Sequence, residues 1–242
     1  MNVTYFRDYE SMSLHASTII FSEIEKEKNL LLCSATGDSP AGLYNRMVYK
    51  SKSQREFFDQ MRVIKLDEWN GVSENHQSTC EYYLRTTLLD PLEISSRRYI
   101  SFVSDSADPA EECYRIQSEL DQKGPIDICI LGLGKNGHIG LNEPGSFLEP
   151  HCHVADLSAE SRQHNMVKSM KNRPKSGLTL GMQDILSARK ILLLISGQNK
   201  ESITKRLLQR RVSTDLPASF LWLHNSVECL IDQNVFLKAS DS

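Results

Sequence analysis

The sequence lacks the features that mark membrane, secreted and nucleic-acid-binding proteins. It contains no apolar run as long as a membrane span. Its N-terminus, MNVTYFRDYESMS, has no basic region followed by an apolar one, so we expect no signal peptide. The formal net charge is only -3, which provides no basic surface for nucleic acid or for an anionic membrane. We therefore expect a cytoplasmic protein that binds neither.

The chain also lacks the cysteine spacings of metal sites and disulfide frameworks. Its six cysteines include no CxxC pair, and several lie in apolar stretches. This distribution favours buried free thiols over disulfides. His151, Cys152 and His153 are adjacent, but successive side chains of a strand point to opposite sides. We therefore expect no metal site there.

The pattern that is present is an alternation of apolar strands and amphipathic helices. With 242 residues, 40% of them hydrophobic and 24% charged, the chain fits one globular domain, residues 1–242. The alternation predicts a doubly wound, mostly parallel α/β sheet with helices on both faces, as in Rossmann-like folds. We expect strands at 29–34, 61–66, 99–103, 126–131, 153–157, 190–196 and 226–231, and helices at 9–26, 40–48, 54–61, 78–88, 108–122, 159–168, 181–186, 199–209 and 218–223.

A glycine-rich segment, residues 132–144 (GLGKNGHIGLNEP), follows the apolar run 126–131 (IDICIL). Open α/β sheets bind ligands at the carboxyl ends of their strands. His138 can transfer protons near neutral pH, and the nearby Glu143 can fix its tautomer. Gly134 leaves room for a ligand to approach the backbone. Taken alone, the loop equally fits a structural histidine held by hydrogen bonds.

A second turn, in residues 31–44 (LLCSATGDSPAGLY), has the composition of a phosphate site. Thr36, Gly37, Asp38 and Ser39 separate an apolar strand from a helix that Pro40 is expected to open. Free backbone N–H groups and the helix dipole attract an anion, and the hydroxyls add donors, so a phosphate monoester fits. The alternative is an ordinary strand–helix turn with Ser39 as the N-cap. A carboxylate at Asp38 disfavours an anion unless the side chain turns away.

A third strand end, in residues 63–69 (VIKLDEW), carries two adjacent acids, Asp67 and Glu68. Neighbouring side chains of an extended chain point to opposite sides. One acid can therefore face a catalytic crevice while the other makes a structural contact. A solvated acidic loop is the alternative.

The three segments resemble the glucosamine-6-phosphate deaminase family, and most closely its galactosamine-6-phosphate deaminase/isomerase branch. The likeness extends from SATGDSP through VIKLDEW and LGLGKNGHIGLNEPG to residues 212–224 (VSTDLPASFLWLH). It implies isomerisation and deamination of an amino-sugar 6-phosphate. Galactosamine 6-phosphate, giving tagatose 6-phosphate and ammonia, is favoured, and glucosamine 6-phosphate, giving fructose 6-phosphate, stays open. The family uses no metal or organic cofactor, and a homo-oligomer is compatible with it.

The resemblance also implies roles for individual residues. Asp67 would move a proton between C2 and C1, and His138, held by Glu143, would open the sugar ring. Thr36, Gly37, Asp38 and Ser39 would form the phosphate loop. Lys200 in SGQNK matches a family phosphate ligand, and Lys168 falls where the family has a phosphate-binding arginine; the alternative for each is a solvated lysine.

The chain departs from the family pattern at Asn136, where the best-known members have aspartate in a DGH triplet. Loss of that charge is expected to lower the basicity of His138 or to leave its tautomer to Glu143. We interpret Asn136 as a mark of the galactosamine branch and include it among the catalytic-site residues.

Two other functions fit parts of this pattern. A 6-phosphogluconolactonase would use the same phosphate turn, but its loop ordinarily lacks the NEP sequence that contains Glu143. A non-enzymatic sugar-phosphate sensor is disfavoured because no DNA-binding module accompanies the domain. The basic segment 168–176 (KSMKNRPKS) fits either a mobile flap over the site or a solvated surface loop.

Overall fold

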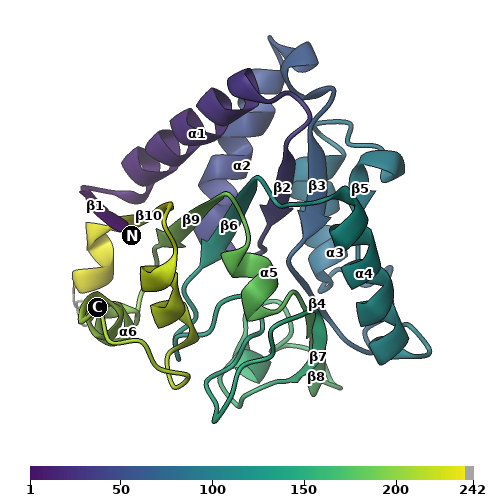
Figure 1. Ribbon diagram of the computed structural model, residues 1–242, viewed down its shortest axis with the longest axis vertical. Coiled ribbons are helices and arrows are strands. Elements are labelled where there is room, and N and C mark those ends of the chain that lie inside the picture. The colour runs from purple at the N-terminus through teal and green to yellow at the C-terminus, as the bar shows by residue number, and fades with distance from the viewer. Residues whose placement is uncertain (238–242) are drawn as a thin grey trace.

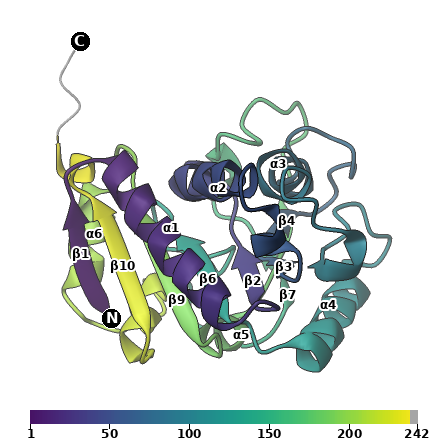
Figure 2. The same cartoon turned by 90° about the horizontal axis from the view of Figure 1, so that it is seen from above.

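A seven-stranded parallel sheet forms the centre of the protein in the computed structural model, which describes residues 1–237. The strand order is β1-β10-β9-β6-β2-β3-β5, and Figure 2 shows β1 at one outer edge. This arrangement confirms the expected doubly wound α/β fold. The strands are β1 (Asn2–Phe6), β2 (Leu31–Ser34), β3 (Arg62–Lys65), β5 (Tyr99–Ile100), β6 (Ile128–Gly132), β9 (Lys190–Ile195) and β10 (Val227–Asp232).

Alternate residues of each central strand pack on opposite faces of this sheet. In β2, for example, Leu31 and Cys33 belong to one hydrophobic cluster and Leu32 to the other. Helices cover both faces, as Figure 1 shows. The first three helices pack on the face of Leu32, and the later three pack on the other. The helices are α1 (Tyr9–Lys26), α2 (Asp38–Ser51), α3 (Cys80–Leu84), α4 (Pro109–Lys123), α5 (Met182–Leu186) and α6 (Glu201–Leu208).

A second, three-stranded sheet lies at the carboxyl end of β3, in the lower part of Figure 1. It is antiparallel in the order β4-β8-β7, with β4 (Asp67–Trp69), β7 (His153–Asp156) and β8 (Ser176–Thr179). The strand expected at 153–157 is thus present, but it belongs to this small sheet. Only Leu66 separates β3 from β4, so the chain passes from one sheet to the other beside Asp67.

Several helix predictions were wrong in extent or type. The segments 54–61, 159–168 and 218–223 contain only 3-10 turns, at Arg55–Phe58, Ser161–Gln163 and Pro217–Leu223. The segment 78–88 divides into α3 and a π-helical stretch, Arg85–Leu89. The helix α2 begins at Asp38 rather than at Pro40. Further 3-10 turns lie at Ser96–Arg98 and Gln233–Phe236, and the strand expected at 99–103 is only Tyr99–Ile100.

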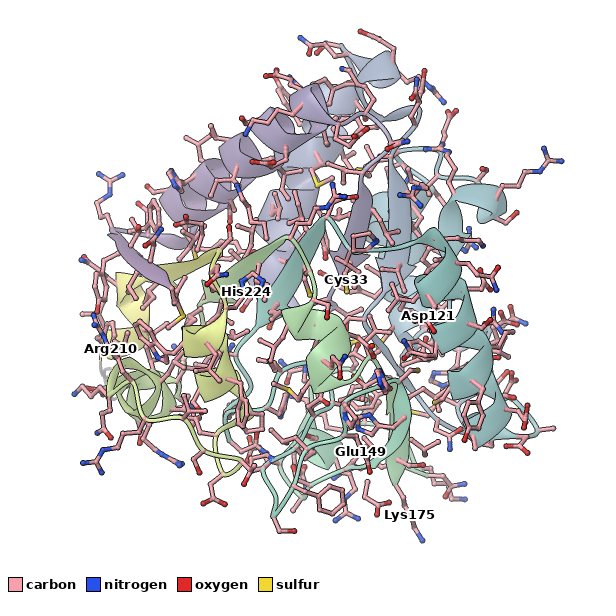
Figure 3. All side chains as sticks on the ribbon, viewed as in Figure 1. Cys33, Asp121, Glu149, Lys175, Arg210 and His224 are labelled. Carbon is pink, nitrogen blue, oxygen red and sulfur yellow. The ribbon has the colours of Figure 1, made fainter. Side chains whose placement is uncertain are left out.

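The cysteines are free thiols, and all except the partly exposed Cys152 are buried. Figure 3 shows Cys33 in the middle of the molecule, whereas Lys175 and Arg210 lie at its periphery. Within residues 1–237, no three His, Cys, Asp or Glu side chains are grouped so as to hold a metal ion. No helix in that part of the chain combines the length and the apolar character needed to cross a bilayer.

Candidate active site

The main candidate site is a cavity of about 450 Å³ where the carboxyl ends of neighbouring strands meet. The strand order reverses between β2 and β6, so the turns after these two strands diverge and leave a crevice. Segments that follow β2, β3, β6 and β9 line it, together with part of the loop between β7 and β8. The expected phosphate turn, acid strand and glycine-rich loop therefore meet in one place.

The turn after β2 presents the N-terminus of α2 to this cavity. Gly37 is the N-cap, with a φ of 107° that favours glycine, and no side chain caps the helix. Ser39 is consequently not the N-cap but lies in the first turn, where the hydroxyl of Ser196 donates to its oxygen at 3.1 Å. The hydroxyls of Tyr9 and Tyr83 donate to the carbonyl oxygens of Asp38 and Gly37 at 2.6 and 2.7 Å. These contacts fix the turn, and the helix dipole attracts an anion to it.

Asp67 lies at the start of β4 and lines the cavity, with only 8% of its surface exposed. Burial, together with the negative charge of Glu68, raises the pKa of its carboxyl group to about 7. The thiol of Cys80 lies 3.8 Å from Oδ1. A carboxylate that gains and loses a proton near neutral pH is suited to moving a proton between two carbon atoms.

Glu68 points away from the cavity into a buried network of charges. Its carboxylate accepts hydrogen bonds from the backbone N–H groups of Trp69, Cys80 and Glu81, all at 2.8 to 2.9 Å. The ammonium of Lys65, which is completely buried, donates to Glu68 at 2.8 Å and to Glu81 at 3.1 Å. Burial opposes the ammonium charge, but the two glutamates raise the pKa of Lys65. The network anchors α3 against the strand that bears Asp67.

His138 and Glu143 form a second pair at the cavity. Nδ1 of His138 lies 3.6 Å from Oε2 of Glu143 and 3.4 Å from the hydroxyl of Ser161. Burial tends to raise the pKa of Glu143, but His138, Ser161 and Asn136 together lower it to about 2. Glu143 and Asn136 lie behind His138 rather than on the cavity wall. The glycine at 134 makes room for the His138 ring, because a β-carbon there would lie 2.4 Å from Nε2.

The two predicted phosphate lysines lie in different surroundings. Lys200, the N-cap residue of α6, lines the cavity, and burial lowers the pKa of its ammonium to about 8. Lys168 is exposed, lies outside the cavity and donates to Oδ1 of Asn165 at 2.9 Å. The loop between β7 and β8 instead places His164 in the cavity wall, and Lys135 lines it after β6. Our sequence interpretation named neither residue, although Lys135 lies inside the glycine-rich motif.

Known proteins resemble the chain over most of its length. Residues 10–230 match the family described as glucosamine-6-phosphate isomerases/6-phosphogluconolactonase. The candidate deaminase AgaI of Escherichia coli (strain K12) is 41% identical over 93% of this chain and 89% of its own. Glucosamine-6-phosphate deaminase 1 of Bacillus subtilis (strain 168) is 34% identical over 96% of this chain and 97% of its own.

Solved structures agree with this similarity. A monomeric glucosamine-6-phosphate deaminase superposes with a TM-score of 0.91 at 33% identity, covering 98% of this chain and 99% of its own. The 6-phosphogluconolactonase of Trypanosoma brucei gives a TM-score of 0.79 at 20% identity, covering 97% of both chains. The second likeness shows a shared fold only.

Proposed function

Because this chain belongs to the glucosamine-6-phosphate isomerase/6-phosphogluconolactonase family and is a hexosamine-6-phosphate deaminase/isomerase, we propose that it converts galactosamine 6-phosphate to tagatose 6-phosphate and ammonia. The observation that carries the reaction is that Asp67 and His138 line one cavity, with Glu143 behind the imidazole of His138. The choice of the galacto substrate rests on the motif resemblance, on Asn136 and on the 41% identity to AgaI.

The first step is ring opening, and His138 carries it. The cyclic sugar must lose a proton from O1 and gain one at the ring oxygen, so a single group that accepts and then returns a proton suffices. Glu143, ionised because its pKa is about 2, orients the imidazole and stabilises the imidazolium that forms for a moment. The NEP sequence thereby supplies the carboxylate that ring opening requires.

The second step moves a proton from C2 to C1, and Asp67 carries it. The open-chain aldehyde withdraws electrons from C2, so Asp67 can remove the C2 proton without help from a cofactor, and O1 takes a proton from the C2 ammonium to give the neutral enolamine. Asp67 then returns the proton at C1, which leaves an iminium at C2. Water adds to that carbon and ammonia leaves, giving the 6-phosphoketose. The turn after β2 and Lys200 would hold the phosphate throughout.

Ammonia release and ketose identity, measured with galactosamine 6-phosphate and glucosamine 6-phosphate separately, test this proposal. We expect release from both, with a higher kcat/KM and tagatose 6-phosphate as the product for the galacto substrate. A preference for glucosamine 6-phosphate would contradict the substrate assignment. Hydrolysis of 6-phosphogluconolactone without ammonia release from either amino sugar would contradict the reaction. Glu143→Gln is the matched variant, because it keeps the shape of the side chain and removes the charge beside His138.

A further inference from the structure

The residue that the reaction leaves unexplained is His164, in the loop between β7 and β8. Its ring lies in the wall of the cavity on the side of the phosphate turn. A β-carbon on Gly37 would lie 3.9 Å from Nε2 of His164, so this nitrogen faces the N-cap of α2. The part of the cavity lined by Thr36, Gly37 and Lys200 is therefore also lined by the loop between β7 and β8, which is distant from these residues in the sequence.

The surroundings of His164 determine which nitrogen carries the proton. The backbone N–H of Met166 points at Nδ1 at 3.4 Å, so Nδ1 is the acceptor and Nε2 carries the hydrogen in the neutral ring. Trp69 lies beside the imidazole, with ring centroids 5.7 Å apart and planes at 41°. The backbone N–H of His164 donates to the carbonyl oxygen of Ser161 at 3.0 Å. These contacts hold an N–H donor toward the turn after β2.

The charges that face His164 favour the neutral ring. Burial is the largest influence that lowers its pKa, and the charges of Lys200 and Lys135 act in the same direction, as does His138 when it is protonated. Asp38, at the start of α2, is the one group among these neighbours that raises it. Protonation would also put a hydrogen on Nδ1 against the N–H of Met166. A bound dianion would add to the influence of Asp38 and draw a proton to the ring.

We propose that His164 binds the phosphate group of the substrate through its Nε2–H, opposite the N-terminus of α2, while Lys200 supplies the cation. The inference deepens the proposed function, since it rests on a phosphorylated substrate. His164, rather than Lys168, is then the ligand from the loop between β7 and β8. It adds a directed donor without burying a second permanent cation beside Lys200.

The side-chain NMR signals of His164 test this directly, with inorganic phosphate as the probe. In the full-length protein labelled with 15N at histidine, saturating phosphate should shift Nε2 of His164 and move the titration midpoint of this ring to higher pH. The signals of His153, which lies on β7 outside the cavity, should stay unchanged. A His164 signal that does not respond to phosphate while the signal of another cavity group does would overturn the inference.

Kinetics give the second readout. His164→Ala should raise KM for the amino-sugar 6-phosphate and Kd for inorganic phosphate by roughly 10- to 100-fold, as for loss of a hydrogen bond to a charged group. It should change kcat by less than about threefold, because the ring acts far from C1 and C2. His164→Gln, which retains an N–H donor, should recover part of the affinity, and His153→Ala should behave as the wild type.

The outcomes separate this inference from the proposed function. If neither amino sugar is a substrate but phosphate still shifts His164 and H164A weakens its binding, only the reaction assignment fails. If ammonia is released normally but both His164 variants bind phosphate as tightly as the wild type, the inference fails. If H164A melts early, Kd for phosphate is measured with H164Q alone, and a Kd equal to that of the wild type, together with a wild-type Nε2 signal that phosphate does not shift, would reject the role of the donor.

Discussion

The side-chain amide of Asn136 donates a hydrogen bond to Oε2 of Glu143 at 2.7 Å, and the same oxygen lies 3.6 Å from Nδ1 of His138. The backbone N–H of His138 in turn donates to Oδ1 of Asn136 at 3.1 Å. The asparagine thus gives Glu143 a neutral donor where an aspartate would add a second negative charge. This contact helps to keep the pKa of Glu143 at about 2.

Asn136→Asp is expected to raise the pKa of Glu143, because two carboxyl groups at hydrogen-bonding distance resist simultaneous ionisation. The decline of kcat/KM at acid pH, which begins with protonation of Asp67, should then become steeper, because the pair of carboxyl groups at positions 136 and 143 takes up a second proton at a pH where Glu143 of the wild type is still ionised. Carbon-13 NMR titration of the Glu143 carboxyl group, alongside the pH–rate profile, measures both effects. A Glu143 titration equal to that of the wild type would show that the Asn136 contact does not control its charge.

Asp67→Asn should abolish exchange of the C2 proton while leaving sugar-phosphate binding nearly intact. In the wild type, the pKa of about 7 means that exchange and turnover should decline as the pH falls below neutrality and Asp67 becomes protonated. Incorporation of deuterium at C2 or C1, followed by NMR, reports this step. Exchange that persists near the wild-type rate would remove Asp67 from the mechanism.

The same variant should be more stable than the wild type at alkaline pH. The pKa of Asp67 is about 7 in the folded protein and close to the ordinary value of 3.8 in the unfolded chain, so the folded state binds the proton more tightly. The cost of the buried charge therefore grows as the pH rises from about 4 to 7, reaching up to about 4 kcal/mol. Urea denaturation at pH 5 and pH 8 should show the larger gain at pH 8. Asp59→Asn, at an exposed position, is the control and should show no such pH dependence.

His138→Gln should slow turnover of the cyclic substrate by roughly 100- to 10,000-fold, which is the range of general acid–base help. A 4,5-dideoxy analogue has no hydroxyl that can close a furanose or a pyranose ring, so its C2 proton exchange should be affected far less. Comparing the two rates in the variant and in the wild type isolates ring opening. Equal losses on both compounds would place His138 in a later step.

Lys200→Met should raise KM for the sugar phosphate by roughly 10- to 100-fold, because a charged hydrogen bond to phosphate is lost. Since the pKa of Lys200 is about 8, KM of the wild type should also rise as the pH passes above 8 and the ammonium loses its proton. Lys168→Met, outside the cavity, tests the other predicted lysine and should change KM little. The reverse ranking of the two variants would assign the phosphate to Lys168.

The sequence was most informative where apolar runs meet polar turns. The runs around Leu31 and Ile128 predicted central strands, and the turns after them contain Ser39 and His138, which the fold brings to one cavity. The edge strand β1 was missed because its side chains are only partly buried and show no apolar run. The strands β4 and β8 were missed because they are short and their pairing depends on contacts between distant segments.

The loop between β7 and β8 shows a second limit of sequence interpretation. Its composition suggested a helix at 159–168, whereas local hydrogen bonds from Ser158 and Ser161 hold a tight turn instead. That turn directs His164 into the cavity and leaves Lys168 outside. The sign of a side chain's charge is visible in sequence, but the direction of a side chain on an irregular loop is set by the tertiary structure.

The buried ammonium of Lys65 links three positions so that none can change alone. Removing either glutamate leaves Lys65 with one carboxylate in place of two, and removing the lysine leaves Glu68 without a cation beside Glu81, at a cost of about 3 to 5 kcal/mol for a broken buried pair. Glu68 must also continue to accept three backbone N–H groups, so an apolar trio would leave those donors unpaired. Related chains that remain folded should therefore vary at these three sites together or not at all, which constrains the neighbourhood of Asp67 independently of any selection on its chemistry.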